Sequence, residues 1–111
     1  MKTTMTYEWA KEMNCNITVC DTTGKIIFMN DRSLAKYGDI TGQNLFDCHN
    51  PQSQQKIKEL LETGGSNSYT IEKNGRWRMI YQTAWMLDGV VAGLVEMAMD
   101  IPEELPHFVR K

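Results

Sequence analysis

The fold is decided by Ser66-Asn-Ser-Tyr-Thr-Ile-Glu-Lys-Asn-Gly-Arg-Trp-Arg-Met-Ile-Tyr-Gln-Thr-Ala-Trp-Met-Leu-Asp-Gly-Val-Val-Ala-Gly-Leu-Val-Glu-Met-Ala-Met99. The pairs Asn74-Gly75 and Asp88-Gly89 are typical of two-residue hairpin turns, in which both central residues take positive φ. Segments 66–73, 76–87 and 90–99 are therefore expected to form three consecutive antiparallel strands.

A second hairpin is predicted nearer the N-terminus. Residues 17–20 alternate apolar and polar side chains, residues 21–24 have turn composition, and residues 25–29 return as a strand. We expect Asn30 to begin a short helix as its N-cap, and Gly38 to end that helix in a left-handed conformation.

The strongest helix signal follows Asn50, which is a good N-cap and precedes Pro51 at the first helical position. Apolar residues then recur at positions 57, 60 and 61, which is helical spacing. This helix is expected to end at the Gly64-Gly65 pair.

Residues 7–13 are predicted to form a short amphipathic helix. Its apolar face carries Trp9, Ala10 and Met13, with Met5 one turn earlier. The order of elements is then one helix, two strands, several helices and three strands. This order predicts an α+β fold in which helices cover one face of a single antiparallel sheet.

Length and composition indicate one domain. A chain of 111 residues with 41% hydrophobic residues can form one compact core but has no room for a second. We divide it into an N-terminal helical extension over residues 1–14, a sheet domain over residues 15–101 and a tail over residues 102–111. Pro102 and Pro106 prevent a continuous helix in that tail, so it should pack locally.

Charge and hydropathy argue against several partners. The net charge of −2 comes from 12 basic and 14 acidic residues mixed along the chain, so no basic face for nucleic acid is expected. No apolar run approaches the roughly 18 residues that span a membrane, and the N-terminus lacks a secretory signal. Cys15, Cys20 and Cys48 cannot form a closed disulfide set, which favours reduced thiols and a cytoplasmic location.

Two parts of the chain resemble PAS domains, and the resemblance covers about residues 14–101. Val19-Cys-Asp-Thr-Thr-Gly-Lys-Ile-Ile-Phe-Met-Asn30 is similar to the opening hairpin of that family, and residues 89–101 are similar to its last strand and closing Asp-Ile. The segment Asp47-Cys-His-Asn-Pro-Gln-Ser53, together with residues 93–97, is closer to a subgroup of bacterial PAS-like domains of unassigned ligand.

The resemblance implies a five-stranded antiparallel sheet whose concave face and flanking helices enclose a pocket. Such a domain binds a small molecule or cofactor, passes the change to a partner, and is generally not catalytic. Because the sequence carries no kinase, cyclase or DNA-binding module, we expect it to act through a separate signalling protein or as a homodimer. It also lacks the Asn-Cys-Arg-Phe-Leu-Gln type of motif that holds flavin in light-sensing relatives, which disfavours flavin.

Cys48 and His49 are candidate pocket residues because they directly precede the helix that begins at Pro51. The N-terminus of a helix attracts anions and lowers a nearby thiol pKa. The alternative is that both side chains only pack and cap. Glu96 is the other candidate, since it lies in a strongly apolar strand.

A buried Glu96 would need a donor such as His49, Gln82, Arg78 or a ligand group. The alternative is a solvent-facing carboxylate on the outer face of the sheet. We expect the pocket between helix 51–63 and the sheet. The predicted ligand-binding residues are Cys48, His49, Ile57, Leu61, Arg78, Ile80, Gln82 and Glu96.

Strand 76–87 has an aromatic face with Trp77, Tyr81 and Trp85, and its other face carries Ile80 and Gln82. Alignment with the family places Ile80 and Gln82 under the helices, which leaves the aromatic face outside and in need of cover. The N-terminal helix or a second copy of the chain would supply that cover. The predicted dimer interface is Trp9, Met13, Trp77 and Trp85. Alternatively, the aromatic face is the core, and Trp77 and Tyr81 line the pocket.

The alternative functions are a haem-binding sensor and an enzyme. The eight methionines suit an irregular core or a haem pocket, and His49 is a chemically reasonable proximal haem ligand, although family haem ligands usually come from the long helix or its neighbour. No other metal site is expected. An enzyme built on Cys48 is disfavoured, because adjacent residues rarely converge as nucleophile and base.

Overall fold

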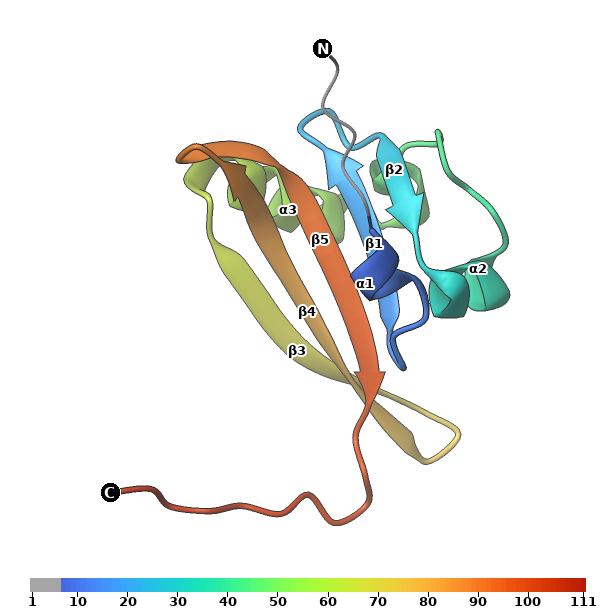
Figure 1. Cartoon of the computed structure of the whole chain (residues 1–111), viewed down its shortest axis with the longest axis vertical. Helices are drawn as coiled ribbons and strands as arrows, with labels where there is room; N and C mark the ends of the chain where they lie inside the picture. The colour runs from blue at the N-terminus through green and yellow to red at the C-terminus, as the bar shows by residue number, and fades with distance from the viewer. Residues whose placement is uncertain (1–6) are drawn as a thin grey trace.

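The computed structural model describes residues 7–111 and contains one five-stranded antiparallel sheet with strand order β2-β1-β5-β4-β3 (Figure 1). The elements along the chain are α1 (Glu8–Lys11), β1 (Asn16–Asp21), β2 (Ile26–Met29), α2 (Asp31–Tyr37), η1 (Leu45–Cys48), α3 (Pro51–Thr63), β3 (Ser66–Lys73), β4 (Arg76–Leu87) and β5 (Val90–Asp100). The predicted α+β fold and its order of elements are confirmed. Within residues 7–111, no helix is long and apolar enough to cross a bilayer.

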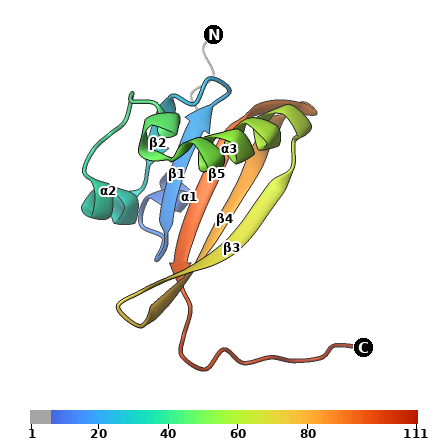
Figure 2. The same ribbon diagram turned by 180° about the vertical axis from the view of Figure 1, so that it is seen from behind.

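The helices lie on both faces of the sheet. In Figure 1, α1 lies in front of β1, whereas Figure 2 shows α3 crossing the opposite face of the sheet. The predicted cover of one face by α2, η1 and α3 is therefore present, and α1 covers part of the other face. The C-terminal tail leaves β5 and runs away from the sheet in both views.

Both hairpin turns have the backbone that their composition predicts. Asn74 and Gly75 have φ of 55° and 74°, and Asp88 and Gly89 have φ of 51° and 78°. This left-handed pair of residues is the turn whose twist matches that of the flanking strands. It fixes the register of β3 on β4 and of β4 on β5.

Helix ends also follow the predicted caps. The side-chain oxygen of Asn50 accepts the backbone N–H of Ser53 at 2.8 Å, and α3 ends at Gly64 in the left-handed region. Gly38 differs from the expectation: its φ is 73°, but its ψ of 175° is extended, so it turns the chain away from α2 without the left-handed helical cap.

Asn30 ties three elements together as well as capping α2. Its side-chain oxygen accepts the backbone N–H groups of Ile17 and Ser33, and its amide donates to the carbonyl oxygens of Ala10 and Cys15. The side chain is fully buried with its hydrogen-bonding groups paired, which anchors the segment before β1 to the start of α2.

The core has two parts, one on each face of the sheet. Under α3 and η1 the buried residues are Cys20, Ile26, Met29, Leu45, Ile57, Leu60 and Leu94. On the opposite face Ala10, Ile17 and Val19 are buried, and Trp85 and Phe28 pack against them. The outer face of β1 is therefore covered by the chain's own N-terminal segment.

The N-terminal helix is shorter than predicted, and of its predicted apolar face Ala10 is buried whereas Trp9 and Met13 are exposed. It spans Glu8–Lys11, with Ala10 buried and Trp9 70% exposed. Asn30 explains the difference, because it binds the carbonyl of Ala10 and thereby holds that residue against the sheet. The predicted position of Met5 lies outside the described residues.

The sequence left open which face of β4 is buried. The structure has the arrangement that the resemblance to PAS domains implies. Ile80 and Gln82 are buried on the side of α3, whereas Trp77 and Tyr81 lie on the outer face and are 50% and 37% exposed. The alternative, in which the aromatic face forms the core, is wrong.

Candidate ligand-binding site

His49 and Glu96 meet between the helical layer and the sheet. The distance between Nε2 of His49 and Oε2 of Glu96 is 3.3 Å. The sheet register places Glu96 of β5 between Thr18 of β1 and Gln82 of β4. His49 is the residue that ends η1, so the short helix presents its ring to the carboxylate.

A chain of hydrogen bonds runs through this pair. Nδ1 of His49 lies 2.9 Å from the carbonyl oxygen of Leu45, which can only accept, so this nitrogen carries a proton. Gln82 donates to Oε2 of Glu96 at 2.9 Å, and the oxygen of the Gln82 amide accepts from Asn67 at 3.2 Å. The bonded chain therefore extends from η1 across β5 and β4 to the edge strand β3.

The pair favours its charged form. The hydrogen bond to Glu96 raises the pKa of His49 against the opposing effect of burial. Burial alone would raise the pKa of Glu96, but the hydrogen bonds from His49 and Gln82 outweigh it and leave that pKa below its ordinary value. Both pKa shifts therefore favour the ion pair of an imidazolium with a carboxylate.

A pocket of about 130 Å³ opens beside the pair. Its walls come from β1, β5, the last residue of α2, η1 and the residues that follow these two helices. They consist of Thr18, Tyr37, Ile40, Leu45, Cys48, His49 and Glu96. The pKa of Tyr37 is raised by burial and then by the negative charge of Glu96, so its phenol stays protonated. The pocket therefore combines one charged pair with two hydroxyls and an apolar wall.

The pocket is nearer η1 and α2 than predicted. Cys48, His49 and Glu96 line it as expected, but Ile57, Leu61, Ile80 and Gln82 do not. Ile57 is fully buried and, with Leu45, Leu60 and Leu94, fills the space under α3, where Leu61 also packs. Gln82 contributes indirectly through its bond to Glu96, and Ile80 is part of the buried face of β4.

Arg78 is engaged elsewhere. It donates to Asp100 at 3.1 Å and to the side-chain oxygen of Asn16 at 2.7 Å. Of the alternative donors to Glu96, Arg78 is therefore not used, and it does not line the pocket. Sequence reasoning missed Thr18, Tyr37, Ile40 and Leu45. Thr18 carried a usable signal, because a polar residue between Ile17 and Val19 of a buried strand faces the helical layer.

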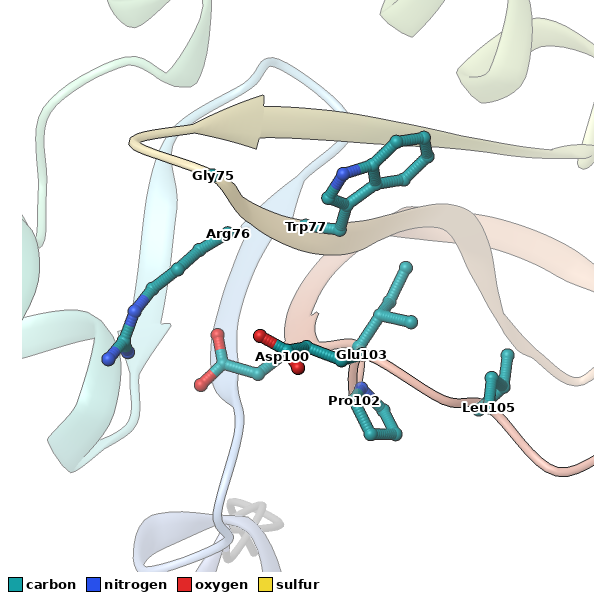
Figure 3. Close-up of a pocket in the computed structure, with 8 residues that line it drawn as sticks. Gly75, Arg76, Trp77, Asp100, Pro102, Glu103 and Leu105 are labelled. Carbon is teal, nitrogen blue, oxygen red and sulfur yellow. The ribbon is translucent and has the colours of Figure 1, made fainter.

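A larger hollow of about 600 Å³ lies at the exit of β5, between the β3–β4 turn and the tail. Figure 3 shows it, with Trp77 on one side, Leu105 on the other, and Arg76 extending away from both. Its charged residues Arg76, Asp100 and Glu103 are exposed to water. We therefore take the pocket with the half-buried charge pair as the candidate site.

The predicted dimer residues differ in their exposure. Trp9, Met13 and Trp77 are 70%, 37% and 50% exposed. Trp85 is instead held within the chain: its Nε1 donates to the carbonyl oxygen of Cys20 at 3.1 Å, and it packs in the cluster around Ile17. Trp85 is therefore an internal packing residue, which corrects its placement on an open interface.

Haem does not fit the residues of the site. Both ring nitrogens of His49 already have partners, and binding iron through Nε2 would displace Glu96. The pocket, at about 130 Å³, is also smaller than the pockets that hold drug-sized ligands and cofactors, which begin at roughly 300 Å³. Among residues 7–111, no group of three or more His, Cys, Asp or Glu residues is placed to hold a metal ion.

Searches with the sequence gave no match to a family model or to a curated protein. Solved structures do match the fold. The PAS domain of histidine kinase ThkA aligns with a TM-score of 0.64 at 15% identity, covering 79% of this chain and 100% of that domain. The fold is PAS-like.

Two further structures extend this likeness. A sensory box sensor histidine kinase from Vibrio cholerae aligns with a TM-score of 0.62 at 12% identity, covering 86% of this chain and 88% of that one. VqmA bound to DPO aligns with a TM-score of 0.67 at 18% identity, covering 86% of this chain and 56% of VqmA. At these identities the likeness describes the PAS-like fold alone.

Proposed function

We propose that this chain is a non-catalytic sensory domain that binds a small molecule in the pocket beside His49 and Glu96. The observation that carries the proposal is the charge pair itself, whose side chains are only 15% and 21% exposed and which lines a pocket. The structural neighbours support the proposal, because they include the PAS domain of histidine kinase ThkA, a sensory box sensor histidine kinase and VqmA bound to DPO.

Stability alone does not explain why an ion pair is placed in a largely buried position. Removing two charges from water costs about as much as their attraction returns, and apolar residues of similar volume often stabilise a core equally well. A pair that is largely removed from water and lines a pocket is better explained by recognition of a polar ligand group.

The geometry supports a binding role over catalysis. Both ring nitrogens of His49 are engaged by Leu45 and Glu96, so this histidine is not arranged as a base for the neighbouring Cys48. Burial raises the pKa of Cys20 to about 11, so the thiol of that residue is protonated at neutral pH.

The signal has a physical route out of the pocket. A ligand that moves the carboxylate of Glu96 changes its bond to Gln82, and Gln82 in turn holds Asn67 on the edge strand β3. The output is then a separate signalling protein or a second copy of this chain, bound through the outer sheet face. Trp9, Met13 and Trp77 are the proposed anchors of that homodimer.

The test is native mass spectrometry, with an absorption spectrum, of the protein purified from its own host. We expect a bound small molecule in a one-to-one ratio with the chain and no haem absorption. The proposal would be contradicted by a folded protein that carries no ligand and binds no compound from a small-molecule extract of its host. That result would favour a ligand-free dimerisation module.

A further inference from the structure

Glu96 has one free oxygen. The ion-pair contact from His49 and the hydrogen bond from Gln82 both end on Oε2 of the carboxylate, and none of the described residues donates to Oε1. Within residues 7–111 no buried side-chain nitrogen or oxygen lacks a partner, so Oε1 retains accessible surface. Because Glu96 lines the pocket, that surface is available to a ligand as a negatively charged acceptor.

Two of the other polar residues of the pocket, His49 and Thr18, already have partners within the chain. His49 has already used both N–H positions, on Leu45 and Glu96. The hydroxyl of Thr18 lies 3.1 Å from that of Ser33, and one of them donates to the other. Tyr37 has a hydroxyl that can donate or accept. The pocket therefore presents mainly acceptor character, next to the apolar side chains of Ile40 and Leu45.

The volume limits the size of the ligand. The pocket measures about 130 Å³. For comparison, an apolar cavity of about 150 Å³ is large enough for benzene. A ligand that fits within the pocket without rearrangement therefore has about six non-hydrogen atoms, as benzene has, and a slightly larger ligand extends through the open side of the pocket.

We infer that the pocket is selective for compact molecules that direct an N–H or O–H donor at Oε1 of Glu96 and place an apolar body against Ile40 and Leu45. This inference rests on the proposed sensory function and names the chemistry of its ligand. Anionic acceptors do not match this site, because Oε1 of the carboxylate can only accept a hydrogen bond. Alcohols, phenols and amines share the required donor.

The test uses the full chain and four probes of similar size: phenol, benzylamine, toluene and benzoate. Backbone and side-chain NMR shifts of Thr18, Ile40 and Leu45 report occupancy of the pocket. We expect phenol or benzylamine to bind with a dissociation constant of about 1 mM, as such small ligands do. Toluene should bind at least tenfold more weakly, because a hydrogen bond to a charged group contributes about that factor or more.

Two variants locate the effect. Glu96→Gln keeps the shape of the side chain but removes its charge, and the preference for donor probes over toluene should fall below about threefold. Ile40→Phe should fill the pocket and reduce binding of all probes. The thermal transition of each variant shows whether it is folded.

The outcomes separate this inference from the function. Binding of toluene or benzoate as strong as that of phenol and benzylamine would overturn the selectivity while leaving a ligand pocket in place. The absence of shifts at the pocket with all four probes would overturn both the selectivity and the proposed binding function. A donor preference unchanged in Glu96→Gln would overturn the assignment to Oε1.

Discussion

His49 contacts Glu96 across the boundary between the helical layer and the sheet, with Nε2 3.3 Å from Oε2. One residue ends a single-turn helix and the other occupies the middle of the last strand. The contact therefore couples the position of η1 to the register of β5. Any ligand that competes for the carboxylate also changes how η1 is held.

The pair should give stability a defined pH dependence. His49 has a raised pKa, so its contribution is complete below its unfolded value of about 6.5 and is lost as pH rises through the folded pKa. Glu96 has a lowered pKa, so its contribution is present above its unfolded value of about 4.5 and is lost as pH falls through the folded pKa.

The stability difference between the wild type and Glu96→Gln should therefore be largest between about pH 4.5 and 6.5 and should decline on both sides. Urea unfolding at a series of pH values measures it. A difference that is flat from pH 4 to 9 would mean that the two groups do not pair in the folded protein.

Asn30→Ala should be much more destabilising than Asn50→Ala, although both residues are helix N-caps. Asn50 makes an exposed cap bond, whose loss costs about 1 kcal/mol. Asn30 is fully buried, and its removal leaves the N–H of Ile17 and the carbonyl of Cys15 without partners. The carbonyl of Ala10 also loses a donor and keeps only the N–H of Met13, so we expect a loss of about 3 kcal/mol or more. Denaturant titration compares the two, and equal losses would show that Asn30 acts only as a cap.

Gly93→Ala should disrupt the sheet between β1 and β5. A Cβ at Gly93 would overlap the carbonyl of Cys20 and the indole nitrogen of Trp85. We expect a loss of about 2–3 kcal/mol, which lowers the melting temperature of a domain of this size by roughly 10 °C or more. Gly75→Ala is the control, because it meets open space and carries only the strain of positive φ, about 1 kcal/mol.

Self-association through the outer sheet face should depend on Trp77. Light scattering over a dilution series is expected to show a dimer at tens of micromolar for the wild type and a monomer for Trp77→Lys. Met86→Lys is the matched control, since Met86 is a similarly exposed apolar residue of the same strand. A strict monomer in the wild type would mean that this face does not bind a second copy.

Local sequence signals predicted most of the fold. Asn74-Gly75 and Asp88-Gly89 fixed the three-strand run, and the caps at Asn30 and Asn50 located both central helices. These features depend on a few adjacent residues, and the structure has them where the sequence places them. The alternation in β4 predicted which residues share a face, but not which face is buried, because that depends on packing against the helices.

The site was less predictable because its walls come from distant segments. Glu96 and His49 stood out as polar residues in distinctive positions, and the structure brings them together. The location of the pocket depends on how completely Ile57 fills the space under α3, and no local pattern reports this. The burial of Trp85 could not be predicted for the same reason, because the segment around Ala10 that covers it is distant in the sequence.

The central claim is that the pocket beside His49 and Glu96 holds the small molecule. The most direct test is native mass spectrometry of His49→Ala and His107→Ala, each purified in parallel with the wild type, His107 being the exposed histidine of the tail. We predict that His49→Ala loses most of the bound compound with a melting temperature lowered by only a few degrees, and that His107→Ala retains it. Equal retention of the compound by both variants would contradict the account.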